Sequence, residues 1–123
     1  MAIYARLTLP SLVDADWCIY ADCDILFTAD PGQLLALGDD TMLCQGHLNP
    51  RDATVDRREF GWFAGNHIPI DPNRYLCSGL LLLNLGLFRT PNVERQCFDF
   101  LSRHPDAYFP DQTAINAVCH GRT

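Results

Sequence analysis

Lysine is absent from this chain of 123 residues, and all nine of its basic residues are arginine. Fifteen acidic residues outnumber them, which leaves a net charge of −6 and a pI near 4.9. Nucleic acids and anionic membranes are bound through basic surfaces. We therefore expect neither nucleic acid nor an anionic membrane as the main partner of this chain.

Long hydrophobic runs are also missing. The longest apolar stretch centres on residues 80–83 and is far too short to cross a bilayer. Hydrophobic residues nevertheless make up 48% of the chain and aromatic residues 11%, which predicts a folded chain and excludes a disordered one. A chain of this length can bury a core, and we expect one domain at most.

Paired cysteines are the third absence. Six cysteines occur singly within apolar stretches, and no C-x-x-C pair is present: Cys18, Cys23, Cys44, Cys77, Cys97 and Cys119. Disulfide frameworks and structural zinc sites both need cysteines at closer, regular spacings. We expect reduced, mostly buried thiols in a cytoplasmic protein, without structural zinc.

Apolar segments of strand length alternate with helical patterns. Residues 4–13 carry apolar residues at near-helical spacing, and Pro10 comes late enough to end or kink that helix. Residues 17–21 and 41–44 have the composition of short strands. Residues 75–85 form a continuous apolar run between turn residues, which is typical of a central strand buried on both faces.

Helix starts are marked by capping residues followed by proline. Asp30 and Pro31 predict a short helix that ends at Gly38, and Thr90 with Pro91 predicts a longer one that ends at His104. A last helix is expected to open with residues 111–116. Residues 46–72 are polar and irregular, and we expect a loop or a mobile helix there. Strands that alternate with helices predict an α/β layered domain.

Asp22 and Asp24 follow directly after the strand expected at residues 17–21. In extended backbone, side chains two residues apart point to the same side, so the two carboxylates would form an anionic, oxygen-rich site. Such a site suits Mg²⁺ or Mn²⁺ better than zinc. The alternative is a turn in which the aspartates cap backbone N–H groups.

Three other segments carry candidate site residues. Arg6 lies on the first predicted helix, where the alternative is a solvated helix face. Gly79, in the predicted central strand, would let another backbone or a ligand come close. Asp111 and Gln112 open the last helix, where an aspartate is common without any function.

These segments stand in a specific order along the chain and together resemble the retaining glycosyltransferases of family 8. The segments are Tyr4-Ala5-Arg6-Leu7, Ala21-Asp22-Cys23-Asp24-Ile25-Leu26, Cys77-Ser78-Gly79-Leu80-Leu81-Leu82-Leu83-Asn84-Leu85 with Arg89, and Asp111-Gln112-Thr113-Ala114-Ile115-Asn116. The resemblance implies a GT-A-like mixed sheet flanked by helices, a Rossmann-like layered domain. It also implies transfer of a hexose from a UDP-sugar, such as UDP-glucose or UDP-galactose, to a glycan or lipopolysaccharide acceptor.

The resemblance assigns roles to individual residues. Asp22 and Asp24 match the D-x-D motif that holds Mn²⁺, or Mg²⁺, at the donor diphosphate. Arg6 matches an arginine that reaches the donor sugar. The segment Cys77-Ser78-Gly79 matches the lining of the sugar pocket. Asp111 and Gln112 match the pair beside the reacting carbon, which would be the catalytic residues.

The chain also departs from the family pattern. Cys77 stands where many relatives carry asparagine. The third metal ligand of the family is a histidine in a C-terminal motif that residues 1–123 do not contain, and the first nucleotide-binding strand is missing as well. We therefore expect residues 1–123 to be a partial family 8 catalytic domain, incomplete at both ends and inactive alone. Any peripheral membrane association would depend on the missing segments.

Two other functions remain open on the sequence. A haloacid-dehalogenase-like phosphatase would use Asp22 as nucleophile and Asp24 as general acid/base, but it normally needs a downstream lysine, which this chain lacks, and Thr or Val in place of Leu26. The other alternative is a non-catalytic remnant of the glycosyltransferase fold that has kept the sheet and lost turnover.

Overall fold

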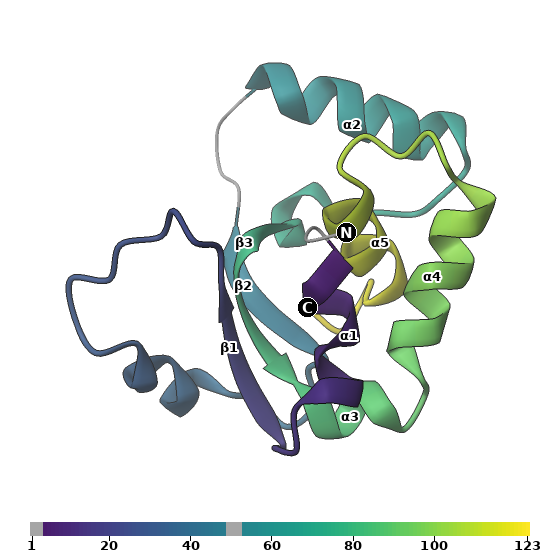
Figure 1. Cartoon of the computed structure of the whole chain (residues 1–123). Helices are drawn as coiled ribbons and strands as arrows, with labels where there is room; N and C mark the ends of the chain where they lie inside the picture. Colours follow the sequence, from purple (N-terminus) through teal and green to yellow (C-terminus); the bar gives the residue numbers. More distant parts are fainter. Residues whose placement is uncertain (1–3, 49–52) are drawn as a thin grey trace.

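The computed structural model describes residues 4–48 and 53–123 and shows a three-stranded sheet with helices packed against it (Figure 1). The strands are β1 (Trp17–Ala21), β2 (Cys44–Leu48) and β3 (Leu76–Asn84), in the order β1-β3-β2. The α/β class and the central position of the long apolar strand are thereby confirmed. β1 and β2 both run antiparallel to β3. A mixed sheet also contains parallel pairs, and the strands of the described residues contain none.

Strand register determines which residues meet at the end of β1. Trp17 pairs with Asn84 and Ala21 pairs with Leu80, so the residue after Ala21 comes level with Gly79. The Asp22 N–H accordingly donates a hydrogen bond of 2.8 Å to the Gly79 carbonyl oxygen. The first D-x-D aspartate is thus held beside the middle of β3 by backbone pairing.

Five α-helices and two 3₁₀-helices complete the described elements. They are α1 (Ala5–Leu12), α2 (Ala53–Gly65), α3 (Leu85–Arg89), α4 (Val93–Arg103), α5 (Pro110–Val118), η2 (Pro31–Leu37) and η3 (Pro72–Arg74). In Figure 1, α1, α3, α4 and α5 lie on one side of the sheet, while η2 and the loop before it lie on the other. None of the helices in this part of the chain has the length and apolar composition to cross a membrane.

The core lies between the sheet and the helices on its covered side. Leu81 and Leu83 of β3 are 1% exposed and belong to one buried cluster with Leu7 of α1 and Ile115 of α5. Burial of a leucine side chain contributes about 1.5–3 kcal/mol, so the uninterrupted apolar run explains why β3 is central. The same strand carries the predicted Cys77-Ser78-Gly79 segment.

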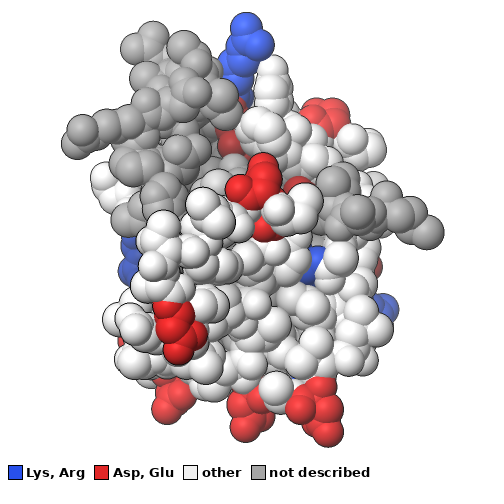
Figure 2. Space-filling view, turned by 60° about the vertical axis from the view of Figure 1, so that its left-hand side comes forward, with Lys and Arg blue, Asp and Glu red and all other residues white. Residues whose placement is uncertain are grey.

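The second face of the sheet is covered less completely. It holds a cleft of about 330 Å³ lined by residues that include Leu34, Leu37, Leu80 and Leu82. Large apolar side chains nearby are exposed, Leu26 to 86%. Figure 2 turns this side of the molecule forward and shows a surface that is mostly uncharged, with acidic side chains in its middle and along its lower edge.

Three boundaries differ from the sequence prediction. The strand expected at residues 41–44 begins only at Cys44, because the Asp39 carboxylate accepts hydrogen bonds from the Thr41 N–H and hydroxyl and holds that segment in a turn. The helix expected from Thr90 begins at Val93 with Asn92 as its cap, because α3 extends to Arg89 and Thr90 ends it. The strand β2 ends at Leu48, inside residues 46–72, where we expected a loop or a mobile helix and where the helix α2 lies.

Other helix ends follow the prediction. Asp30 caps η2 through the Gly32 N–H, and Pro31 takes the first position. His104 ends α4, and α5 contains residues 111–116. Pro10 lies inside α1, two residues before its end. Capping residues therefore located the start of η2 and the end of α4 from the sequence alone.

All six cysteines are free, but they are less uniformly buried than expected. Cys44, Cys97 and Cys119 are fully buried, Cys18 and Cys77 are half-buried, and Cys23 is exposed. Burial raises the pKa of the Cys97 thiol to about 12, and burial also raises the pKa of Cys44 and Cys119 above the ordinary value of 9.0.

The buried thiols predict a loss of stability in alkali. Above pH 9 the unfolded chain releases thiol protons that the folded chain retains, so the free energy of unfolding falls between pH 9 and about 12 and is fully present below that window. For Cys97 the loss between pH 8 and pH 10 is about 1.4 kcal/mol. Urea unfolding of Cys97→Ala should show a pH dependence that is weaker by this amount.

The control is Cys23→Ala, at an exposed cysteine. Its free energy of unfolding should depend on pH as that of the unsubstituted chain does. If both variants lose stability equally between pH 8 and pH 10, the Cys97 thiol does not resist ionisation in the folded chain.

Candidate functional site

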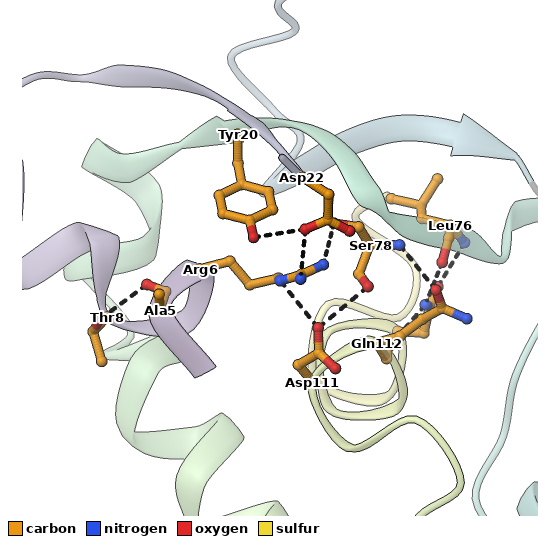
Figure 3. A network of polar contacts seen from close by, with 10 residues as sticks. Ala5, Arg6, Thr8, Tyr20, Asp22, Leu76, Ser78, Asp111 and Gln112 are labelled. Carbon is orange, nitrogen blue, oxygen red and sulfur yellow. Dashed lines mark hydrogen bonds and ion pairs between the residues drawn. The ribbon is translucent and has the colours of Figure 1, made fainter. Parts of the chain in front are cut away.

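Arg6 lies at the centre of a buried polar network that joins the predicted segments (Figure 3). It lies on α1, yet only 6% of the residue is exposed. Its Nη2 atom is 2.8 Å from Asp22 Oδ1 and its Nε atom is 3.0 Å from Asp111 Oδ2. The Nε contact is an ion pair without hydrogen-bond alignment. A buried guanidinium needs such partners because desolvation of an unpaired charge costs several kcal/mol.

Two further contacts fix the guanidinium. Its Nη1 donates a hydrogen bond to the Ser78 carbonyl oxygen on β3. Its centre lies 4.5 Å from the centroid of the Tyr20 ring, a cation–π arrangement. Arg6 is therefore not part of a solvated helix face, which was the alternative open on the sequence.

Tyr20 ties the same network to β1. Its hydroxyl donates a 2.7 Å hydrogen bond to Asp22 Oδ1, the oxygen that also binds Arg6. Burial, together with this bond to the carboxylate, raises the pKa of the Tyr20 hydroxyl, which therefore stays protonated as a donor. The sequence analysis missed Tyr20, although its position two residues before Asp22 places both side chains on one side of a strand.

Asp22 faces Gly79 with its second oxygen. A β-carbon built on Gly79 would lie 3.2 Å from Asp22 Oδ2 and 3.9 Å from Cys77 Sγ. Cys77 and Gly79 therefore share one face of β3, whereas the Ser78 hydroxyl points to Asp111 of α5. Asp22 contacts the buried network through Oδ1 and borders the Cys77–Gly79 face through Oδ2.

The extended backbone expected from Asp22 to Asp24 is wrong. β1 ends at Ala21, and the Ile25 N–H donates to the Asp22 carbonyl oxygen at 3.1 Å, which closes a turn. Local hydrogen bonding in that turn replaces strand pairing, and it leaves Asp24 exposed to solvent. Within residues 4–48 and 53–123, no group of three or more His, Cys, Asp or Glu side chains is arranged to hold a metal ion.

The first turn of α5 supplies the opposite wall of the network. Asp111 and Gln112 are each 8% exposed. The Ser78 hydroxyl donates to Asp111 Oδ2 at 3.2 Å, and the Ser78 N–H donates to Gln112 Oε1 at 2.9 Å. Although the start of a helix favours an aspartate anyway, these side chains point inward to Arg6 and β3. Figure 3 shows the two α5 side chains facing the strand.

Asn116 continues this contact one helical turn later. Its Oδ1 accepts from the Leu76 N–H and its Nδ2 donates to the Leu76 carbonyl oxygen, both at 2.8 Å. The amide thus satisfies both backbone groups of the first residue of β3. The sequence analysis did not single out this role, although Gln112 and Asn116 are spaced to share one face of a helix.

Glu59 of α2 is a further buried polar residue that was not predicted from the sequence. It is 2% exposed, and its Oε1 accepts hydrogen bonds from the Tyr75 hydroxyl and, at 2.9 Å, from Thr113 Oγ1. No periodic pattern marks Glu59 in the sequence. Only its position directly before the aromatic residue Phe60 distinguishes it from the charged residues that precede it.

The chain is similar to known proteins in sequence and in fold. The model of the family described as "Glycosyl transferase family 8" matches residues 1–123. General stress protein A of Bacillus subtilis (strain 168) is 28% identical over 131 aligned residues, which cover 97% of this chain and 41% of that protein. The chain thus spans less than half the length of this curated relative.

A solved structure shows the same fold. The apo structure of the bifunctional glycosyltransferase WbbM superposes with a TM-score of 0.79 at 21% identity, over 98% of this chain and 23% of that chain. At this identity the match establishes a shared fold. The family match, by contrast, extends over the whole sequence, and the chain belongs to glycosyl transferase family 8.

Proposed function

We propose that this chain forms part of a retaining hexosyltransferase that uses a UDP-sugar donor and a glycan or lipopolysaccharide acceptor. One observation carries the proposal. Arg6, Asp22, Ser78 and Asp111 come from four separate segments of the chain and meet in one network of hydrogen bonds and ion pairs. A purely structural helix start or turn would not require charged residues from so many elements to be buried together.

The residues present fit a divalent cation such as Mn²⁺ or Mg²⁺. Arg6 and Tyr20 bind Asp22 Oδ1, and Asp22 Oδ2 and the exposed Asp24 supply the oxygen atoms that such cations prefer. Cations of this type commonly use one or two carboxylates and complete their shell with water and substrate phosphates. When bound, the cation would offset negative charge on the diphosphate leaving group.

The donor sugar would lie against the Cys77–Gly79 face of β3. Gly79 has no side chain there, and the half-buried Cys77 offers a surface for contact in place of the amide that many relatives carry. Ser78 would hold this part of β3 in place, because its N–H and hydroxyl are bound to Gln112 and Asp111. Arg6 would reach the sugar from the same network.

Asp111 and Gln112 would act at the reacting carbon. A carboxylate or amide oxygen near that carbon stabilises oxocarbenium-like character in the transition state. Arg6 and Ser78 hold the Asp111 carboxylate in place, and the Ser78 N–H holds the Gln112 amide. Groups fixed in advance in this way need no reorganisation when charge develops.

The phosphatase alternative has no support beyond the D-x-D segment, since the family match is to a glycosyl transferase family over residues 1–123. Hydrolysis of an aryl phosphate by the full-length protein would revive it. The non-catalytic alternative requires a different test. Mn²⁺-dependent hydrolysis or transfer from UDP-glucose or UDP-galactose would rule it out, and binding of UDP without turnover would favour it.

The first prediction from this site concerns Asp24. In the full-length protein, Asp24→Asn should weaken Mn²⁺ binding on the order of ten-fold or more, about 1.4 kcal/mol. Because Asp24 is exposed, thermal unfolding should change by no more than about 0.5 kcal/mol. Asp14→Asn, at another exposed aspartate, is the control for loss of surface charge. Calorimetric titration with Mn²⁺ and UDP makes the comparison, and equal affinities in the two variants would remove Asp24 from the site.

The second prediction concerns Gly79. An alanine β-carbon would press on Asp22 Oδ2 at 3.2 Å, and the carboxylate cannot move freely because Arg6 and Tyr20 hold its other oxygen. Gly79→Ala should therefore lower Mn²⁺ affinity and cost about 1–3 kcal/mol of stability. Urea unfolding and the same titration measure both effects.

Gly61→Ala is the matched control, since a β-carbon there meets no atom within 4 Å. It lies in α2, so the substitution should leave Mn²⁺ affinity unchanged and stabilise the chain by about 0.5–1 kcal/mol. Unchanged Mn²⁺ affinity in Gly79→Ala would show that Asp22 Oδ2 is not a ligand.

A further inference from the structure

A chain of hydrogen bonds leads from α2 to the candidate catalytic amide. Glu59 Oε1 accepts the proton of the Tyr75 hydroxyl, and the Tyr75 oxygen accepts a hydrogen bond of 3.3 Å from Gln112 Nε2. At its other end the Gln112 amide accepts from the Ser78 N–H through Oε1 at 2.9 Å. Gln112 is therefore held at both its oxygen and its nitrogen.

We propose that Glu59 is a positioning residue that fixes the orientation of the Gln112 amide through the Tyr75 hydroxyl. The inference rests on the proposed function, because it assigns Glu59 to the support of a residue placed beside the reacting carbon. The connection from Glu59 to Gln112 runs through the Tyr75 hydroxyl.

The direction of each hydrogen bond gives the physical reason. A tyrosine hydroxyl has one proton, and once that proton is donated to Glu59 the oxygen can only accept from Gln112. A reversed amide would place Oε1 against this acceptor and its NH₂ group against the Ser78 N–H. Both contacts would be unfavourable, so the amide oxygen is fixed toward Ser78. Without Glu59, the Tyr75 hydroxyl is free to donate to Gln112. The reversed amide would then be unfavourable only at the Ser78 N–H and no longer at Tyr75.

The hydroxyl is itself well fixed in place. Tyr75 is 2% exposed, and its ring makes edge contacts with Phe60 at 5.2 Å and with Phe63 at 6.1 Å between centroids, both on α2. Burial, followed by the bond to Glu59, raises the pKa of the Tyr75 hydroxyl far above its ordinary value. The hydroxyl therefore remains a donor to Glu59 throughout the pH range in which the folded chain is studied.

The test uses two substitutions. Each removes one of the two hydroxyl groups that donate a hydrogen bond to Glu59 Oε1. Tyr75→Phe breaks the connection to Gln112, and Thr113→Val removes a second bond to Glu59 Oε1 while the Gln112–Tyr75 hydrogen bond keeps both its partners. A merely structural role for Glu59 predicts similar effects of both. The positioning role predicts an effect on Gln112 from Tyr75→Phe only.

The first measurement is the side-chain NH₂ resonance of Gln112 in ¹⁵N-labelled full-length protein, assigned by its loss in Gln112→Glu. Tyr75→Phe should shift this resonance and speed its hydrogen exchange, and Thr113→Val should leave it in place. Glu59→Met should resemble Tyr75→Phe, and Glu59→Gln, which keeps an acceptor for Tyr75, should restore the original resonance. An unmoved resonance in Tyr75→Phe, or an equal shift in Thr113→Val, would overturn the proposal.

The second measurement is sugar transfer from a UDP-hexose. Misplacement of Gln112 should lower kcat on the order of ten-fold or more in Tyr75→Phe, with little change in the donor KM, and Thr113→Val should match the unsubstituted enzyme. Equal kcat values in both variants would overturn the positioning role. If the unsubstituted full-length protein transfers no hexose, the proposed function fails, and the resonance alone decides whether Glu59 orients Gln112.

Discussion

The buried charge of Arg6 is the constraint on which the rest of this site depends. A guanidinium with 6% exposure requires carboxylates at fixed distances, and it finds them on Asp22 and Asp111, at the end of β1 and the start of α5. Loss of one partner would leave the guanidinium paired with a single carboxylate, and loss of both would leave an uncompensated buried charge at a cost of several kcal/mol. The positions of α1 and α5 relative to the sheet are therefore tied to the same three charges.

The central strand β3 contributes to the site on two sides, through Ser78 on one side and through Cys77 and Gly79 on the other. Ser78 joins the buried network through Asp111 and Gln112, while Cys77 and Gly79 lie together beside Asp22 Oδ2. The register of β1 then brings Asp22 level with Gly79. One carboxylate thereby borders both sides of the strand.

Hydrophobic pattern and capping chemistry made much of this fold predictable. The run around residues 80–83 identified the central strand, and Asp30 with Pro31 located η2. The D-x-D backbone was mispredicted because the periodicity of a strand says nothing about where its pairing stops. Glu59 could not be predicted for a different reason. Two of its partners, Tyr75 and Thr113, are 16 and 54 residues away in sequence, and only tertiary packing brings them together.

The two oxygens of the Asp22 carboxylate have different contacts and therefore different roles. Oδ1 already accepts from Arg6 and Tyr20, and two such bonds to a charged group are worth more than bonds between neutral groups. They hold the side chain in one rotamer before any ligand arrives, so a ligand at Oδ2 would not have to pay for ordering it. The same bonds withdraw Oδ1 from the ligand. A cation bound here, as we propose, would therefore depend on one oxygen of Asp22, on Asp24 and on the proposed donor diphosphate. Binding of the cation and of the donor would then be mutually dependent.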